Sequence, residues 1–141
     1  MQTQQPQAPA SLVELFGEPI HTYTRGQALE DGFLVDVSET AREAGFRFPV
    51  AMTRAAWVDC IEWTDADTKR QTYQDESGRL WDVIWMASRA ARRGGSETLF
   101  ELLRVPRGGR GQRPRRVVLK MHCGPGDAGE PCITISLPSE D

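Results

Sequence analysis

The feature that most constrains the fold is the alternation of side-chain polarity between residues 115 and 123. Apolar and polar side chains take alternate positions there, with Val117, Leu119, Met121 and Cys123 against Arg116, Lys120 and His122. A two-residue period predicts a β-strand with one buried face. Loops rich in Gly and Pro, 106–114 and 124–131, bound this strand. We therefore expect hairpins, with further strands at 99–105 and 132–137.

Residue phase can be assigned in only one of the two outer strands. In the strand 132–137, Ile133, Ile135 and Leu137 should face the core. The strand 99–105 is apolar on both faces, so its phase stays open. Cys132 should then lie opposite Ile133 and point away from the core.

Helix signals dominate the chain before this sheet. The strongest helix is expected at 80–93, with a core stripe of Leu80, Ile84, Ala87 and Ala91 and an end at Gly94–Gly95. Shorter elements are expected as helices at 12–16, 24–31, 38–45 and 54–63, a strand at 33–36, an extended connector at 46–50 and a loop or loosely helical link at 64–79. This order predicts an α+β fold, with N-terminal helices packed on a C-terminal three-stranded antiparallel β-meander.

Length and composition favour one soluble domain. The chain has 141 residues, of which 39% are hydrophobic and 26% charged. Residues 1–9 are rich in Gln and Pro and are expected to form a disordered tail, so the single α+β domain should span 10–141. No apolar run approaches about 18 residues, and the start lacks the pattern of a signal peptide. We expect a cytoplasmic protein that does not contact a membrane.

The net charge of −3 conceals a strong segregation of charge along the chain. Residues 1–88 hold 14 acidic and 7 basic side chains, a net −7. Residues 89–120 hold 10 basic and 2 acidic side chains, a net +8, and residues 121–141 hold 4 acidic ones, a net −4. A basic band between two acidic regions favours a charged binding surface over a uniformly basic nucleic-acid binder.

The sharpest motif in this band is the arginine loop, residues 106–116. Its arginines are separated by Gly and Pro at the tip of the predicted hairpin. Such a loop can contact nucleic-acid phosphates, dock on an acidic partner protein or pack against this chain's own acidic helices, and a merely solvated loop is the simplest interpretation. The candidate binding residues are Arg107, Arg110, Arg113, Arg115, Arg116 and, on the outward face of the next strand, Lys120.

Four tryptophans fall on two neighbouring predicted helices. Core packing is expected for Trp57 and Trp81, whereas Trp63 and Trp85 are candidates for partly exposed interface aromatics. Exposed Trp beside Arg is typical of interface hot spots. These two residues therefore join the arginines as candidate site residues.

No motif points to catalysis, a metal or a cofactor. Cys60 should be a core residue, and Cys123 and Cys132 lack the spacing of a zinc knuckle. The acidic pairs Asp59/Glu62 and Asp65/Asp67 are expected to be solvated surface groups. We expect a non-enzymatic protein with free thiols; a cysteine- or metal-dependent enzyme would need a thiol of low pKa or a bound metal.

Three blocks resemble a family of small uncharacterised proteins carried by bacterial plasmids, phages and other mobile elements. They span residues 31–57 (DGFLVDVSETAREAGFRFPVAMTRAAW), 78–86 (GRLWDVIWM) and 123–141 (CGPGDAGEPCITISLPSED). The resemblance implies no activity and no site residues. It implies a context, because accessory proteins of such elements often act on host defences or on maintenance of the element.

These observations lead to two hypotheses of function. The first is a non-catalytic protein that binds and inhibits a protein of the bacterial host, of anti-CRISPR or anti-restriction type. The alternative is a nucleic-acid-binding accessory protein that uses the arginine loop. The oligomeric state stays open.

Overall fold

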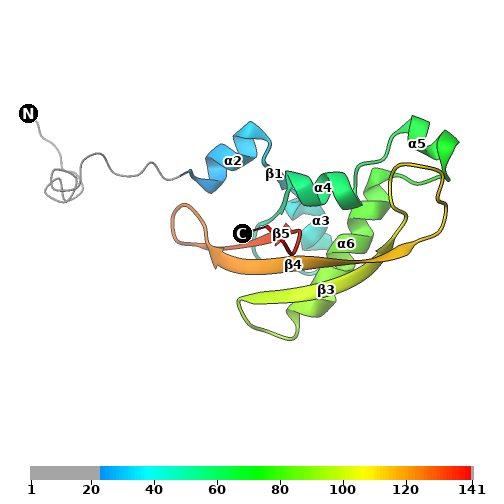
Figure 1. Cartoon of the computed structure of the whole chain (residues 1–141). Helices are drawn as coiled ribbons and strands as arrows, with labels where there is room; N and C mark the ends of the chain where they lie inside the picture. The colour runs from blue at the N-terminus through cyan, green and yellow to red at the C-terminus, as the bar shows by residue number, and fades with distance from the viewer. Residues whose placement is uncertain (1–22, 141) are drawn as a thin grey trace, which may run out of the picture.

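The computed structural model describes residues 23–140 (Figure 1). The tail predicted at 1–9 and the helix predicted at 12–16 lie outside the described residues. The helices are α2 (Arg25–Asp31), α3 (Ser38–Glu43), α4 (Arg54–Cys60), α5 (Asp65–Arg70) and α6 (Glu76–Ala91). The strands are β1 (Leu34–Asp36), β2 (Val50–Thr53), β3 (Glu97–Arg104), β4 (Arg115–Pro125) and β5 (Pro131–Ser136).

The α+β class is correct, but the prediction of a three-stranded antiparallel meander is wrong. The described strands form one five-stranded mixed sheet in the order β1-β2-β5-β4-β3. β3, β4 and β5 make the expected hairpins, while β2 pairs parallel with β5 and β1 pairs antiparallel with β2. β2 was not predicted, and only its first residue, Val50, lay in the connector predicted at 46–50. Val50, Ala51 and Met52 are all buried, which removes the alternation that marks a half-exposed strand.

Short side-chain caps decide where the helices begin. Asp75 accepts from Gly78 N at 2.6 Å and starts α6 four residues before the predicted start at 80. Thr64 and Asp67 form a capping box that starts α5 inside the predicted link 64–79. Apolar periodicity does not mark a helix whose first turn is polar. The starts of α5 and α6 are marked instead by their capping residues.

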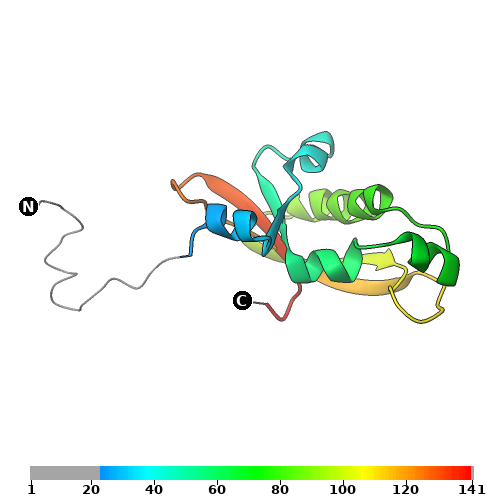
Figure 2. The same cartoon turned by 90° about the horizontal axis from the view of Figure 1, so that it is seen from above.

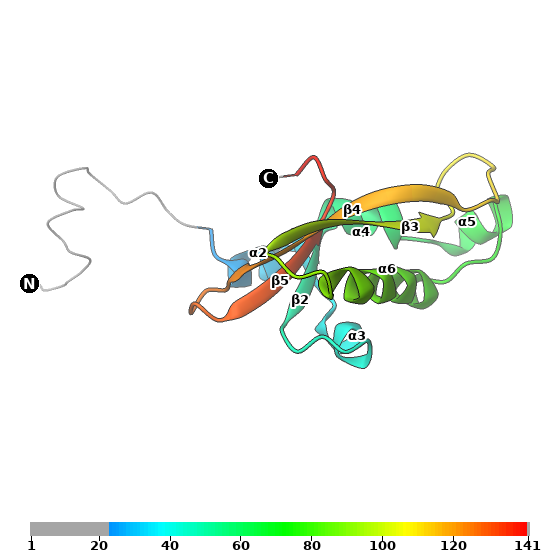
Figure 3. The ribbon, with the colours of Figure 1, turned by 90° about the horizontal axis from the view of Figure 1, so that it is seen from below.

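The core lies between one sheet face and the helices α3 and α6, which Figure 3 shows on the same side of the sheet. The helix α4 adds Ala56 and Cys60 to this core. The predicted inward positions of β4 and β5 are confirmed by Leu119 and Ile135, both 0% exposed. The phase of β3 is also fixed, because Phe100 and Leu102 are buried. Leu99 and Leu103 therefore face the opposite side of the sheet, where they are 54% and 63% exposed.

The opposite sheet face is covered over β5, the middle strand, where α2 lies beside the β4–β5 hairpin (Figure 2). Asp127 accepts from Arg25 N at 2.7 Å and from Gly26 N at 2.9 Å, so the hairpin loop fixes the first turn of α2. Cys132 lies on this face, as predicted, but it is buried. No comparable contact covers the β3 end of this face among the described residues.

Candidate interaction surfaces

The arginine loop is held by a buried glutamine that the sequence did not single out. Gln71, 4% exposed, donates from Nε2 to Pro106 O at 2.8 Å and to Gly111 O at 2.6 Å. Its Oε1 accepts from Gly108 N at 2.8 Å. One side chain thus satisfies three backbone groups of the loop, and the first half of the loop is fixed against α5.

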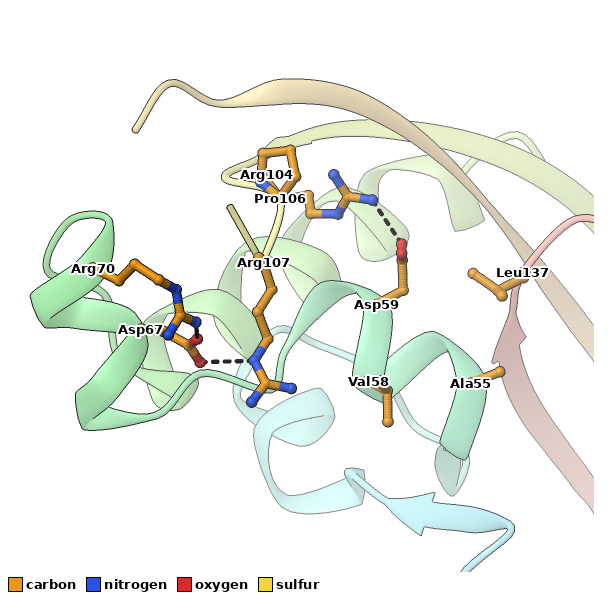
Figure 4. A pocket seen from close by; sticks show the side chains of 10 residues that line it. Ala55, Val58, Asp59, Asp67, Arg70, Arg104, Pro106, Arg107 and Leu137 are labelled. Carbon is orange, nitrogen blue, oxygen red and sulfur yellow. Dashed lines mark hydrogen bonds and ion pairs between the residues drawn. The ribbon is translucent and has the colours of Figure 1, made fainter. Parts of the chain in front are cut away.

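Arg107 is an internal ion-pair residue. Its Nε donates to Asp67 Oδ2 at 2.7 Å (Figure 4), and its Nη1 lies 3.0 Å from Glu62 Oε2. Packing against the chain's own acidic helices was one of the four interpretations of the loop, and it describes Arg107. Asp67, predicted to be a solvated acid, is instead 1% exposed and also pairs with Arg70.

The hollow beside this network has a volume of about 720 Å³, and half of its ten lining residues are charged groups that pair with one another (Figure 4). Arg104 donates to Asp59 at 2.8 Å on one side of it, and Arg107 and Arg70 meet Asp67 on the other. These lining arginines have carboxylate partners within the chain. The hollow is therefore a structural ion-pair network, and it offers little unpaired charge to a ligand.

The carboxylate of Asp67 titrates far below its ordinary range. The Thr64 backbone N–H and the Arg107 guanidinium lower the pKa of Asp67 from 3.8 to about 2. A folded-state pKa below the unfolded one means that the ionised form stabilises the native state. This stabilisation is complete above about pH 4 and is lost as the pH falls from about 4 toward 2.

Replacement of Asp67 by Asn should therefore flatten the acid side of the stability profile. We expect the wild type to lose free energy of unfolding between pH 4 and pH 2.5 more steeply than Asp67→Asn does, in urea titrations followed by circular dichroism. Asp65→Asn, at an exposed position in the same helix, is the matched control. Parallel profiles for the wild type and Asp67→Asn would contradict this assignment.

The other predicted loop cations fall into two groups. Arg110, Arg113, Arg115 and Arg116 are exposed, and of these only Arg116 has an ion-pair partner among the described residues, Glu101 at 3.6 Å. Lys120 does not extend an arginine surface, because its Nζ donates to the backbone oxygen of Glu140. Glu140 also accepts from Thr53 Oγ1 at 2.7 Å, so Lys120 helps to hold the C-terminal residues on the sheet.

A groove runs between α6 and the outer edge of β3. One hollow of about 510 Å³ is lined by Trp81, Trp85 and Met86 from α6 and by residues 101–103 of β3. A second, of about 470 Å³, shares Met86 and Glu101 and continues to Arg89 and Arg93. The first hollow also touches Leu103 and Arg116, whose side chains lie on the other sheet face, so it extends around the edge of β3.

The aromatic residues of this groove were assigned only in part by the sequence. Trp85 is 42% exposed, as expected for an interface candidate, and its ring stacks on that of Trp81 at 5.9 Å between centroids. Trp81, expected in the core, is 37% exposed. Trp63, the other interface candidate, is buried: it donates to Thr68 Oγ1 at 3.1 Å, and Arg79 lies 4.6 Å above its ring.

The outer edge of β3 presents backbone groups without a strand partner among residues 23–140. Ser96 O accepts from Cys123 N on the β4 side, whereas Leu99 O accepts from Arg93 Nη2 at 2.6 Å. Because backbone groups alternate in direction along a strand, those of Glu101 and Leu103 point away from β4. A strand edge of this kind accepts an added strand unless something blocks it.

All three cysteines are free thiols, and two of them, Cys60 and Cys132, are buried. Burial raises the pKa of Cys60 to about 12, so this thiol, which lies in the core as predicted, stays protonated at neutral pH. Burial also raises the pKa of Cys132. Across residues 23–140, no cluster of three or more Cys, His, Asp or Glu side chains is arranged to hold a metal ion.

A protein-family model described as a family of unknown function, DUF6573, matches residues 15–141. The chain belongs to DUF6573. The family carries no assigned function, so DUF6573 membership fixes neither an activity nor site residues. No curated protein and no solved structure matches this chain. In the described part of this DUF6573 member, no helix has both the length and the apolar character that a membrane span requires.

Proposed function

We propose that this DUF6573 protein is a non-enzymatic interaction protein that binds a protein partner by strand addition at the outer edge of β3. One observation supports this most strongly: α6 extends an exposed Trp81–Trp85–Met86 flank beside an edge strand that has outward-facing backbone groups. An added strand would hydrogen-bond to β3 and place alternate side chains on that flank. The flank of α6 and the outer edge of β3 thus border a hollow in which one added strand could lie.

The chemistry of the groove specifies the occupant as an extended segment that combines apolar and acidic residues. The exposed flank of α6 supplies the apolar contact surface. Three arginines, Arg89, Arg93 and Arg116, line the groove together with two acids, Asp82 and Glu101. The excess of basic groups beside an aromatic centre favours an acidic partner through faster association and charge complementarity.

Affinity capture from bacterial lysate with four forms of the full chain tests this site. Glu101→Pro removes an outward N–H and no β3–β4 bond, and Glu101→Ala is its matched control. Trp85→Ser removes a stacked aromatic at an exposed position. We expect one captured protein that resists nuclease, is retained by Glu101→Ala and binds more than about tenfold more weakly to Glu101→Pro and Trp85→Ser. Capture that neither variant weakens would refute the site, provided that both variants melt like the wild type.

The narrower proposal concerns the partner's role. The resemblance to proteins of mobile elements supports a cytoplasmic bacterial host-defence protein, of restriction or CRISPR type, as the partner that is inhibited. Expression of the wild type should then restore plating of a restricted phage, and Trp85→Ser should fail to do so. Equal plating with and without the wild type across such systems would exclude counter-defence, while the strand-addition site would be judged by the capture experiment.

Nucleic-acid binding remains the second candidate because Arg110, Arg113 and Arg115 are exposed and have no ion-pair partner among the described residues. Arg110→Ala/Arg113→Ala should abolish salt-sensitive binding to DNA or RNA in filter or gel assays. The exposed pair Arg42→Ala/Arg47→Ala removes the same charge elsewhere and should leave binding intact. Unchanged binding by the loop variant would exclude this function.

A further inference from the structure

A small cavity lies where the groove meets the C-terminal end of β3. It has a volume of about 90 Å³ and is lined by Arg79 and Arg104, with Cys60 and Asp82 nearby. It shares Asp82, Leu102 and Leu103 with the hollow beneath Trp81 and Trp85. The cavity therefore continues the proposed strand-addition groove, and through Arg104 it also adjoins the charged hollow of Figure 4.

Both arginines retain a buried nitrogen without a hydrogen-bond partner among the described residues. Arg79 is 4% exposed; its Nε donates to Ile61 O and its Nη1 to Val105 O, each at 3.0 Å, but its Nη2 has no acceptor. Arg104 uses Nη2 on Asp59, and its Nε is unpartnered. Buried donors on cations almost always have partners in folded proteins. Two unpaired donors on two arginines that line one cavity therefore point to an acceptor that the described residues do not supply.

The missing acceptor is best supplied by a carboxylate. A guanidinium is charged at all accessible pH values, and its planar array of donors matches two carboxylate oxygens. The cavity volume equals that of about three waters in the liquid, which is enough for a carboxylate group. Asp82 lines the same cavity and makes no ion pair with either arginine in the described residues, so it does not fill this role.

We propose that the Arg79–Arg104 cavity is a carboxylate-binding subsite that selects an acidic side chain in the partner strand. This inference rests on the proposed strand addition, because the position of the cavity at the end of the groove brings such a side chain within reach. Asp82 repels the bound carboxylate, and its removal strengthens binding. The two guanidinium groups, on residues that line one cavity, supply the specificity that the backbone of β3 cannot.

Sodium acetate is the probe for the subsite, with sodium chloride at equal ionic strength as its control. In NMR spectra of the guanidinium N–H groups of the full chain, acetate should shift the Arg79 and Arg104 signals saturably. Arg104→Gln should weaken acetate binding at least about tenfold, whereas Arg89→Gln, in the same groove, should not change it. Asp82→Asn, at an exposed helix position, should strengthen binding.

The outcomes separate the subsite from the strand-addition site. Equal shifts with chloride, no effect of Asp82→Asn, or inorganic phosphate binding more than tenfold tighter than acetate would overturn the carboxylate subsite. A captured partner that binds Arg104→Gln as tightly as the wild type would overturn its role in selection. The two sites can also fail separately. If acetate binds as expected but partner capture is insensitive to Glu101→Pro, strand addition is refuted and the anion site stands.

Discussion

Arg79→Met should lower the free energy of unfolding by about 3 kcal/mol. The substitution leaves two buried backbone acceptors, Ile61 O and Val105 O, without a donor, and each such loss costs on the order of 1–3 kcal/mol. It also removes the cation above the Trp63 ring. Part of this cost is recovered, because burial opposes the charge of Arg79 and lowers its pKa. Against a total stability of about 5–15 kcal/mol, the change is large.

Urea unfolding followed by tryptophan fluorescence measures this loss. The matched control is Arg47→Met, since Arg47 is exposed and a substitution there should change stability by less than about 0.5 kcal/mol. A stability of Arg79→Met within that same margin would mean that Arg79 contributes no net stability, as some buried charges do not when apolar groups replace them.

Gln71→Ala should release the arginine loop while the sheet stays folded. Three hydrogen bonds to Pro106, Gly108 and Gly111 are lost, but the exposed loop can replace them with water, so we expect a stability loss of only about 1–2 kcal/mol. Local opening of the loop should increase about 5- to 30-fold, because 1.4 kcal/mol corresponds to a factor of ten.

Limited trypsin digestion under native conditions measures that opening, because cleavage after Arg107 and Arg110 requires the loop to leave Gln71. Mass spectrometry of the first products identifies the cleaved bonds. Gln112→Ala, in the same loop, removes a side chain that is exposed and should digest like the wild type. Equal first-cleavage rates for Gln71→Ala and Gln112→Ala would show that Gln71 does not fix the loop.

Local sequence patterns predicted the strands and helices that have one buried face and one solvent-exposed face. The alternation in β4 and the Gly/Pro loops predicted the hairpins, and the 3.6-residue stripe predicted α6. β2 has both faces covered, and its parallel pairing joins residues about eighty positions apart in the chain. Neither property leaves a periodic signal within a short window. The wrong sheet size follows from these two facts.

The candidate site could be predicted only where exposure follows from local sequence. Trp85 lies on the flank of the predicted helical stripe, whereas the burial of Trp63 depends on Arg79, sixteen residues later. Arg79 did carry a signal that the sequence analysis missed, since an arginine four residues before Val83 shares a helix face with buried apolar groups. The pairing of Arg107 with Asp67 could not be predicted, because it depends on a contact between α5 and a loop that lies far from it in the chain.

Arg93 limits the length of β3 that is open to pairing with another strand. Its guanidinium donates a hydrogen bond to the outward carbonyl of Leu99. Among the described residues of β3, the longest segment whose outward backbone groups are free therefore runs from Glu101 to Leu103. Two residues suffice to fix the register of one incoming strand, but they are too few to propagate strand-to-strand association between copies of the chain. By covering the Leu99 carbonyl, Arg93 therefore shortens the stretch of β3 that is open to strand pairing, for a partner segment and for a second copy of the chain alike.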